Sequence, residues 1–107
     1  MSISQIHQQA YTAAQAASNE AFEQRGRQDG YPCGFAWVTV YGVKLNTREG
    51  REFKALGFRK AYQGGIQLWN PAGWGVQNVD VKEAGARAYA AVLRAAGYDA
   101  YADSRFD

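Results

Sequence analysis

The feature that most constrains the fold is a ten-residue run without a charged side chain, residues 33–42. Alternate side chains of an extended strand point to opposite faces. Here one face would carry Phe35, Trp37, Thr39 and Tyr41, and the other Ala36, Val38 and Val40. Because neither face carries a charge, the run is predicted to be a central strand that is partly covered on both sides.

The composition limits how a core can form around this strand. The length of 107 residues fits a single domain spanning residues 1–107. The hydrophobic fraction is 47%, but 19 residues are alanine and only 19 are Leu, Ile, Val or Phe. The core must therefore depend on the 15 aromatic residues and on close packing of alanine. These aromatic residues and a net charge of only +2 argue against disorder.

Capping residues and apolar spacing predict three helices. The predicted helices cover residues 2–25, 47–56 and 81–96, with Ser2, Asn46 and Asp80 as their N-caps. The buried stripes are predicted to comprise Ile3, Ile6, Ala10, Ala13, Ala17 and Ala21 in the first helix and Val81, Ala84, Ala88, Ala91, Val92 and Ala95 in the last.

Three further strands complete the expected fold. Gly64 and Gly65 separate two short apolar runs, 58–63 and 66–70, which indicates a hairpin. Residues 98–103 alternate and are predicted to be the last strand, and residues 27–32 a loop. An N-terminal helix (1–26) thus precedes a βαββαβ core (33–103). This order predicts an α+β fold, a ferredoxin-like four-stranded antiparallel sheet with an added helix.

Residues able to perform catalysis or bind metal are few. One cysteine, Cys33, and one histidine, His7, exclude an ordinary zinc site, and no motif indicates a cofactor. Nucleotide-binding and hydrolase motifs are absent from the sequence, so a non-catalytic protein is expected. A small enzyme using Asp99, Asp103 or Arg105 is a third interpretation. With no apolar run long enough to span a bilayer and no signal pattern, the expected location is the cytoplasm.

Aromatic side chains on one sheet face favour a binding function. Bases stack on exposed aromatic rings of such sheets in RNA-recognition modules. The candidate stacking residues are Trp37, Tyr41, Tyr62 and Trp69. Arg59 and Lys60 would contact phosphate, because residues 44–60 carry six basic and two acidic side chains. The candidate ligand is a nucleotide-like molecule or a nucleic acid.

Three amides surround a glycine-rich loop that follows the hairpin. Asn70, Gln77 and Asn78 are candidates for hydrogen bonds to the edge of a base, and Trp74 lies between them in sequence. Each also has a structural explanation, because asparagine commonly forms turns and shapes loops.

Two alternatives leave no free platform. The first helix could bury its apolar stripe against the aromatic face, or two copies could form a homodimer, sheet to sheet or helix to helix. In either case the protein would be an interaction module, for example one that inhibits a host protein.

Five short strings stand out in the second part of the sequence: residues 31–38 (YPCGFAWV), 57–60 (GFRK), 69–71 (WNP), 77–86 (QNVDVKEAGA) and 104–107 (SRFD). They are similar to strings in a family of small, uncharacterised tailed-bacteriophage proteins. The resemblance implies a phage protein acting in the bacterial cytoplasm, in host takeover or in countering host defence. It implies no site residue, because the family has no assigned activity.

Overall fold

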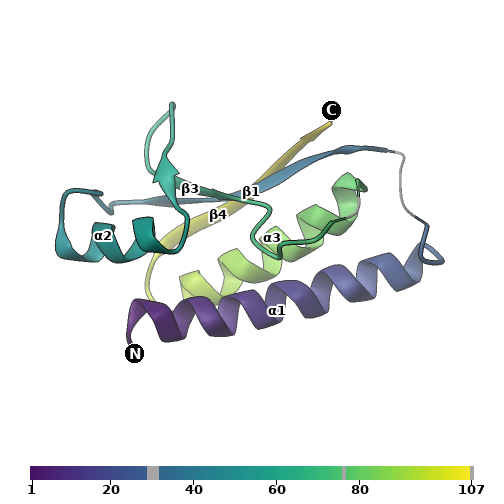
Figure 1. Cartoon of the computed structure of the whole chain (residues 1–107), viewed down its shortest axis with the longest axis horizontal. Coiled ribbons are helices and arrows are strands. Elements are labelled where there is room, and N and C mark those ends of the chain that lie inside the picture. The colour runs from purple at the N-terminus through teal and green to yellow at the C-terminus, as the bar shows by residue number, and fades with distance from the viewer. Residues whose placement is uncertain (29–31, 76, 107) are drawn as a thin grey trace.

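The computed structural model describes residues 1–28, 32–75 and 77–106. Helices and strands alternate over this part of the chain, which confirms the α+β class (Figure 1). In chain order the elements are α1 (Ile3–Gln24), β1 (Gly34–Tyr41), α2 (Arg48–Ala55), β2 (Arg59–Lys60), β3 (Ile66–Trp69), α3 (Val79–Ala95) and β4 (Asp99–Phe106).

The uncharged strand is central, as predicted. The four strands lie in the order β2-β3-β1-β4, and all three neighbouring pairs are antiparallel. Ala36, Val38 and Val40 of β1 are fully buried. Since the odd-numbered residues of β1 must then point the other way, the expected division of its two faces is confirmed.

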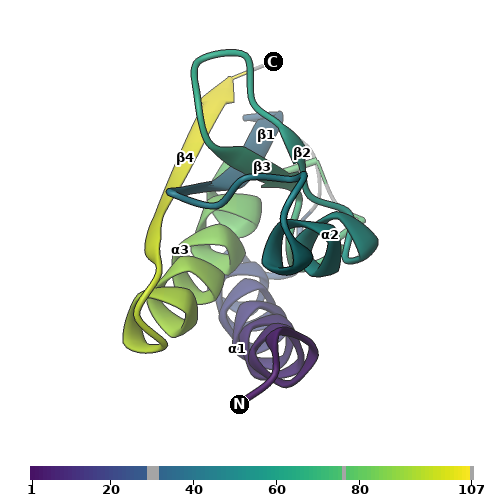
Figure 2. The ribbon, with the colours of Figure 1, turned by 90° about the vertical axis from the view of Figure 1, so that its left-hand side faces the viewer.

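All three helices of the described residues lie on one side of the sheet. Figure 2 shows α2 and α3 beneath the strands and α1 beneath these helices, on the side away from the sheet. The main partner of α1 is α3. The alternative in which the first helix covers the aromatic face is therefore wrong.

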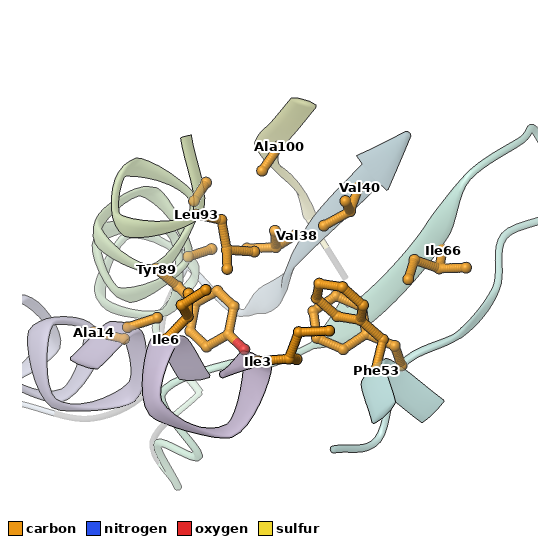
Figure 3. Packing of buried hydrophobic residues seen from close by; sticks show 14 of the residues in the cluster. Ile3, Ile6, Ala14, Val38, Val40, Phe53, Ile66, Tyr89, Leu93 and Ala100 are labelled. Carbon is orange, nitrogen blue, oxygen red and sulfur yellow. The ribbon is translucent and has the colours of Figure 1, made fainter. Parts of the chain in front are cut away.

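Aromatic rings fill the core between the sheet and the helices, as the composition required. Val38 and Val40 meet Tyr89 and Leu93 of α3 and Phe53 of α2 (Figure 3). The ring of Phe53 lies edge-on to those of Phe58 and Tyr98, with centroids 5.1 and 5.2 Å apart. Ile3 and Ile6 bring the start of α1 into the same cluster.

The buried stripes of α1 and α3 differ in phase from the expected ones. After Ala10, the buried residues of α1 are Ala14, Ser18 and Phe22, each one position later than predicted. On α3 only Val81 was predicted correctly, and the buried set otherwise comprises Val79, Gly85, Ala86, Tyr89, Ala90 and Leu93. Alanine occurs on several faces of both helices, so its spacing could not determine which face is buried.

The ends of several elements also differ from the predictions. The capping box of Ser2 and Gln5 is confirmed. The cap of α2 is Thr47 and not Asn46, because the Thr47 hydroxyl accepts a hydrogen bond from the Gly50 amide. Helix α3 begins at Val79, two residues earlier than predicted, so Asp80 lies in its first turn and pairs with Arg25.

The hairpin at Gly64 and Gly65 is confirmed, with both glycines at positive φ. Strand β2, however, has only two residues, whereas β4 runs three residues further than predicted, to Phe106. The predicted loop 27–32 includes residues 29–31, which lie outside the described residues. Tyr31 and Asp107 of the family strings lie outside them as well.

The contact between α1 and α3 requires a glycine. A Cβ atom on Gly85 would lie 2.4 Å from Ser18 Oγ and 2.9 Å from Ala72 Cβ. The Ser18 hydroxyl is buried and donates a hydrogen bond of 2.8 Å to the Val81 carbonyl. The two helices can approach this closely only because position 85 has no side chain.

A polar contact joins the same helices. His7 Nδ1 lies 2.7 Å from the hydroxyl of Tyr89, which is fully buried. Burial raises the pKa of Tyr89, so this phenol stays protonated. Partial burial also lowers the pKa of His7, which favours the neutral imidazole that can accept the phenol hydrogen bond.

Replacing Gly85 should loosen this packing. For Gly85→Ala we expect a loss of about 1–3 kcal/mol in the free energy of unfolding, the usual cost of overpacking a core. Urea denaturation measures it. Gly75→Ala is the matched control, because a Cβ there meets no atom within 4 Å, and it should change stability little. Equal stability of the two variants would contradict the packing described above.

The histidine contact predicts a pH dependence. Because the folded-state pKa of His7 lies below its ordinary value of 6.5, its contribution to stability is complete above pH 6.5. It is lost as the pH falls from 6.5 toward the folded-state pKa. Chemical denaturation at a series of pH values should show that His7→Gln loses less stability than the wild type over this range. Parallel losses in the two proteins would show that His7 does not contribute.

Candidate nucleic-acid interface

The sheet face opposite the helices carries exposed aromatic side chains. The registers β1–β3 and β1–β4 determine which residues neighbour one another across the strands. None of the described helices covers this surface, which we call the open face (Figure 2). Its half-exposed aromatic residues, with their exposed fractions, are Phe35 (38%), Tyr41 (45%), Trp69 (45%) and Tyr101 (53%), and the partly buried Trp37 lies among them.

A stacked pair of tryptophans lies at the centre of the open face. Trp37 and Trp69 are directly opposite each other on β1 and β3, and their rings stack at 4.6 Å with an angle of 22°. The indole N–H of Trp69 donates a hydrogen bond of 3.2 Å to Gln67 Oε1. Phe35 lies edge-on to Trp69 at 6.0 Å. These contacts hold the exposed indole in one orientation, as a stacking platform requires.

Arg105 lies beside this aromatic cluster and was not predicted as a binding residue. Its register partner on β1 is Phe35, and its guanidinium carbon lies 5.5 Å from the Phe35 ring centroid and 5.7 Å from that of Trp69. An arginine in this position supplies a planar cation next to exposed rings. The last strand was predicted to end at Asp103. Arg105 was therefore not assigned to either face of the sheet.

A second aromatic pair continues the open face toward the other end of β1. Tyr41 and Tyr101 have ring centroids 6.1 Å apart. Hydrogen bonding to Asp99, together with its negative charge, raises the pKa of Tyr101, so the phenol stays neutral. Tyr101 thus presents an uncharged ring beside Tyr41.

The predicted phosphate contacts lie elsewhere than expected. The Arg59 guanidinium donates hydrogen bonds to the carbonyls of Lys54 and Phe58, 3.2 and 2.8 Å away, at the end of α2. Lys60 alternates to the helix side of the sheet, because its register partner is the buried Ile66. Tyr62 is fully exposed in the hairpin turn. The structure therefore brings Trp37 and Trp69 into contact, with Tyr41 further along the same face. Arg59 is the register partner of Gln67, which is bonded to Trp69, although its guanidinium is bonded at the end of α2. Lys60 and Tyr62 lie apart from these rings.

The three amides have structural surroundings. Asn70, at a φ of 49°, closes the loop after β3: its side chain donates to the Trp74 carbonyl and accepts from the Trp74 amide. Asn78 is buried at the start of α3, and the Gln77 carbonyl accepts from the Gly34 amide. The structural explanation considered for Asn70 accounts for its contacts, and none of the three amides belongs to the strands that form the open face.

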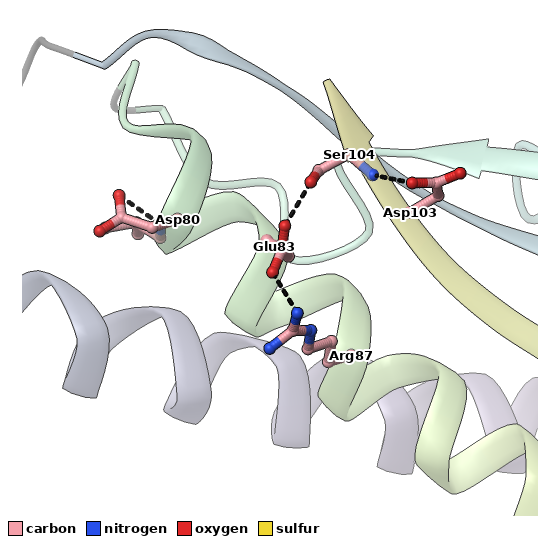
Figure 4. A network of polar contacts seen from close by, with 6 residues as sticks. Asp80, Glu83, Arg87, Asp103 and Ser104 are labelled. Atoms are coloured by element: carbon pink, nitrogen blue, oxygen red, sulfur yellow. Dashed lines mark hydrogen bonds and ion pairs between the residues drawn. The ribbon is translucent and has the colours of Figure 1, made fainter. Parts of the chain in front are cut away.

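The acidic residues considered for catalysis are engaged separately. Asp103 accepts a hydrogen bond from the Ser104 amide, and Asp99 faces Tyr101. Glu83 of α3 contacts the Ser104 hydroxyl and forms an ion pair of 2.5 Å with Arg87 (Figure 4). Among the residues drawn, each carboxylate thus has its own partner, and the geometry pairs no carboxyl groups for acid–base work.

Side chains also occupy backbone groups of the edge strand β4. Arg94 donates a hydrogen bond of 2.8 Å to the Ala100 carbonyl, and the Ser104 amide donates to Asp103. Ala100 and Ser104 are an even number of residues apart on β4, so their backbone N–H and C=O groups point in the same direction. Because two of these groups are already hydrogen-bonded to side chains, the edge of β4 is partly protected against pairing with another strand.

The comparisons with known proteins return no match: no protein-family model, curated protein or solved structure is similar to this chain. None of the helices in the described ranges is long and apolar enough to cross a membrane. In the same ranges, no group of three or more His, Cys, Asp or Glu side chains is placed to hold a metal ion.

Proposed function

We propose that the chain is a non-catalytic binding protein whose open face stacks the bases of a single-stranded nucleic acid. The observation that carries this proposal is the platform of half-exposed aromatic rings around the stacked pair Trp37 and Trp69. Each base stacked on an aromatic ring contributes about 1–3 kcal/mol, independently of sequence. The rings available along β1, from Phe35 to Tyr41, would accept successive bases.

Single strands suit this surface better than a duplex. Bases in a duplex are stacked on one another, so an aromatic platform meets their rings only where the strand is open. A duplex is bound mainly through its phosphates, which calls for a strongly basic surface. The open face carries Asp99 and Asp103 as well as Arg105, and the whole chain has a net charge of only +2.

The proposal extends to the ferredoxin-like topology. The strand order β2-β3-β1-β4, the antiparallel pairing and the position of α2 and α3 on one face all support it. A four-stranded sheet with stacking aromatics is the arrangement that RNA-recognition modules use. This parallel is an analogy of architecture, and the function rests on the site itself.

The biological setting belongs to the same proposal and rests only on the resemblance of short sequence strings. In this setting the chain is a phage protein of the bacterial cytoplasm that binds nucleic acid during host takeover or against host defence. Extracts of infected cells, untreated or treated with a nuclease that degrades both RNA and DNA, would test it, since the protein should elute with nucleic acid only in the untreated extract.

A second candidate function uses the same surface. Trp, Tyr and Arg are the residues most enriched at the energetic centres of protein interfaces, and the open face combines Trp69, Tyr101 and Arg105. This observation favours an interaction module that binds a host protein or a second copy of the chain. Sedimentation velocity distinguishes the homodimer, which should dissociate in Trp69→Ala.

Removing one ring should weaken binding to single strands. For Trp69→Ala and Tyr101→Ala we expect an affinity loss of about 5- to 150-fold, the equivalent of about 1–3 kcal/mol. Fluorescence anisotropy with short fluorescein-labelled oligonucleotides measures it.

The matched control is Phe106→Ala. Phe106 is also an exposed aromatic residue of β4, but it alternates to the helix side, because its register partner is the buried Gly34. The Phe106→Ala variant should bind the single-stranded oligonucleotides with the same affinity as the wild type. Failure of the wild type to bind any oligonucleotide, or an equal loss in Phe106→Ala, would contradict the proposed function.

A further inference from the structure

A cavity lies at one end of the sheet, where β1 leads into α2. Its volume is about 500 Å³, within the range of small-ligand sites. Val43 and Ile66 are buried, and Leu45 is half-buried, so the floor is largely apolar. The lining residues are Gly42, Val43, Lys44, Leu45, Asn46, Lys60, Gly65 and Ile66.

Two ammonium groups give this cavity its charge. Lys44 lies between β1 and α2, and Lys60 is the last residue of β2. Both are exposed, and neither forms an ion pair with any described residue. They are the first and last residues of the segment 44–60, which contains six basic and two acidic residues. One of these acids, Glu49, accepts a hydrogen bond from Tyr98 and does not line the cavity. An apolar cavity with two unpaired lysines favours an anion attached to an apolar body.

The cavity adjoins the open face through a single glycine. Gly65 lines the cavity, and it precedes Ile66, whose partner on β1 is Val40. A Cβ on Gly65 would lie 2.7 Å from the Val40 carbonyl and 3.1 Å from Tyr41 Cδ1. The ring of Tyr41 is thus in contact distance of the backbone that borders the cavity. Lys60 and Ile66 belong to the helix side of the sheet, so a strand that leaves the open face at Tyr41 passes around the end of β1, at Gly42, to reach the two lysines.

We propose that this cavity binds the terminal phosphate, with its nucleotide, of the strand whose bases stack on the open face. The inference rests on the proposed function and adds a direction to it: one end of the bound strand is fixed beside Tyr41. Lysine binds phosphate as a point charge, and a terminal phosphate carries more charge than an internal one. The apolar floor of the cavity accommodates the sugar and base.

The test compares oligonucleotides that differ only at their ends. Four versions of one short labelled sequence carry a phosphate at the 5′ end, at the 3′ end, at both or at neither, with the label placed internally. Anisotropy titrations should show about tenfold tighter binding when one particular end is phosphorylated, the gain expected of a charge-assisted contact. Lys44→Gln combined with Lys60→Gln should abolish this gain and keep the affinity for the strand without terminal phosphate.

Lys54→Gln is the matched control. It removes one positive charge from the same basic segment, where the cavity variant removes two, but Lys54 is exposed on α2 and does not line the cavity. This variant should keep the gain from the terminal phosphate. All three substituted lysines are exposed, and circular dichroism checks that the variants fold as the wild type does.

The outcomes separate the two proposals. Equal affinity for all four oligonucleotides, or the same loss in Lys54→Gln as in the cavity variant, would overturn the terminal-phosphate site and leave the stacking function standing. Absence of binding to every oligonucleotide would overturn both.

Discussion

The close contact between α1 and α3 determines which surface of the molecule is open. At Gly85 any side chain would overlap Ser18 and Ala72, so α1 reaches α3 only because this position is a glycine. Once packed there, α1 has buried its apolar stripe from Ile3 to Phe22 on the helical side. None of the described helices then remains to cover the aromatic face of the sheet. The aromatic face is exposed because α1 packs on the opposite side.

The order of the elements could be predicted because its signals are local. Ser2 caps α1 through its own side chain. A pair of glycines between two short strands, here Gly64 and Gly65, favours a hairpin turn whatever the rest of the fold. The side on which α1 packs could not be predicted, since alanines at several spacings give no unique buried stripe. The discriminating residues were Gly85 and Tyr89, whose importance becomes visible only when α1 lies against them.

The candidate site was predicted in part for a similar reason. Alternation along β1 was enough to assign Trp37 to the aromatic face. Its contact with Trp69 depends on the register between β1 and β3, which the hairpin sets. Arg105 was missed because Ser104 to Phe106 has no apolar alternation, and pairing with β1 is what makes this segment a strand. Asn70 was assigned to ligand recognition, whereas it stabilises its own loop at a positive φ.

The exposed apolar surface of the open face supports the proposal that this face binds a partner. The helical side already has a complete core, with Val38, Val40, Ala100 and Tyr89 fully buried, so folding does not require large rings on the other side. Leaving Trp69 and Tyr101 half-exposed forgoes about 25 cal/mol for each Å² of apolar surface that stays in water. Contiguous apolar surface of this kind is typical of interaction sites.

The charges on the same face restrict what that partner can be. Arg105 stands against two acidic residues, Asp99 and Asp103, so these three side chains sum to a net negative charge. Long-range attraction cannot bring a polyanion to this part of the face, and ring contacts must supply most of the affinity. The uncompensated lysines lie beyond Tyr41, at one end only. In the proposed function, a surface with aromatic rings along its length and positive charge at one end would discriminate between the two directions of a bound strand, which a uniformly basic surface cannot do.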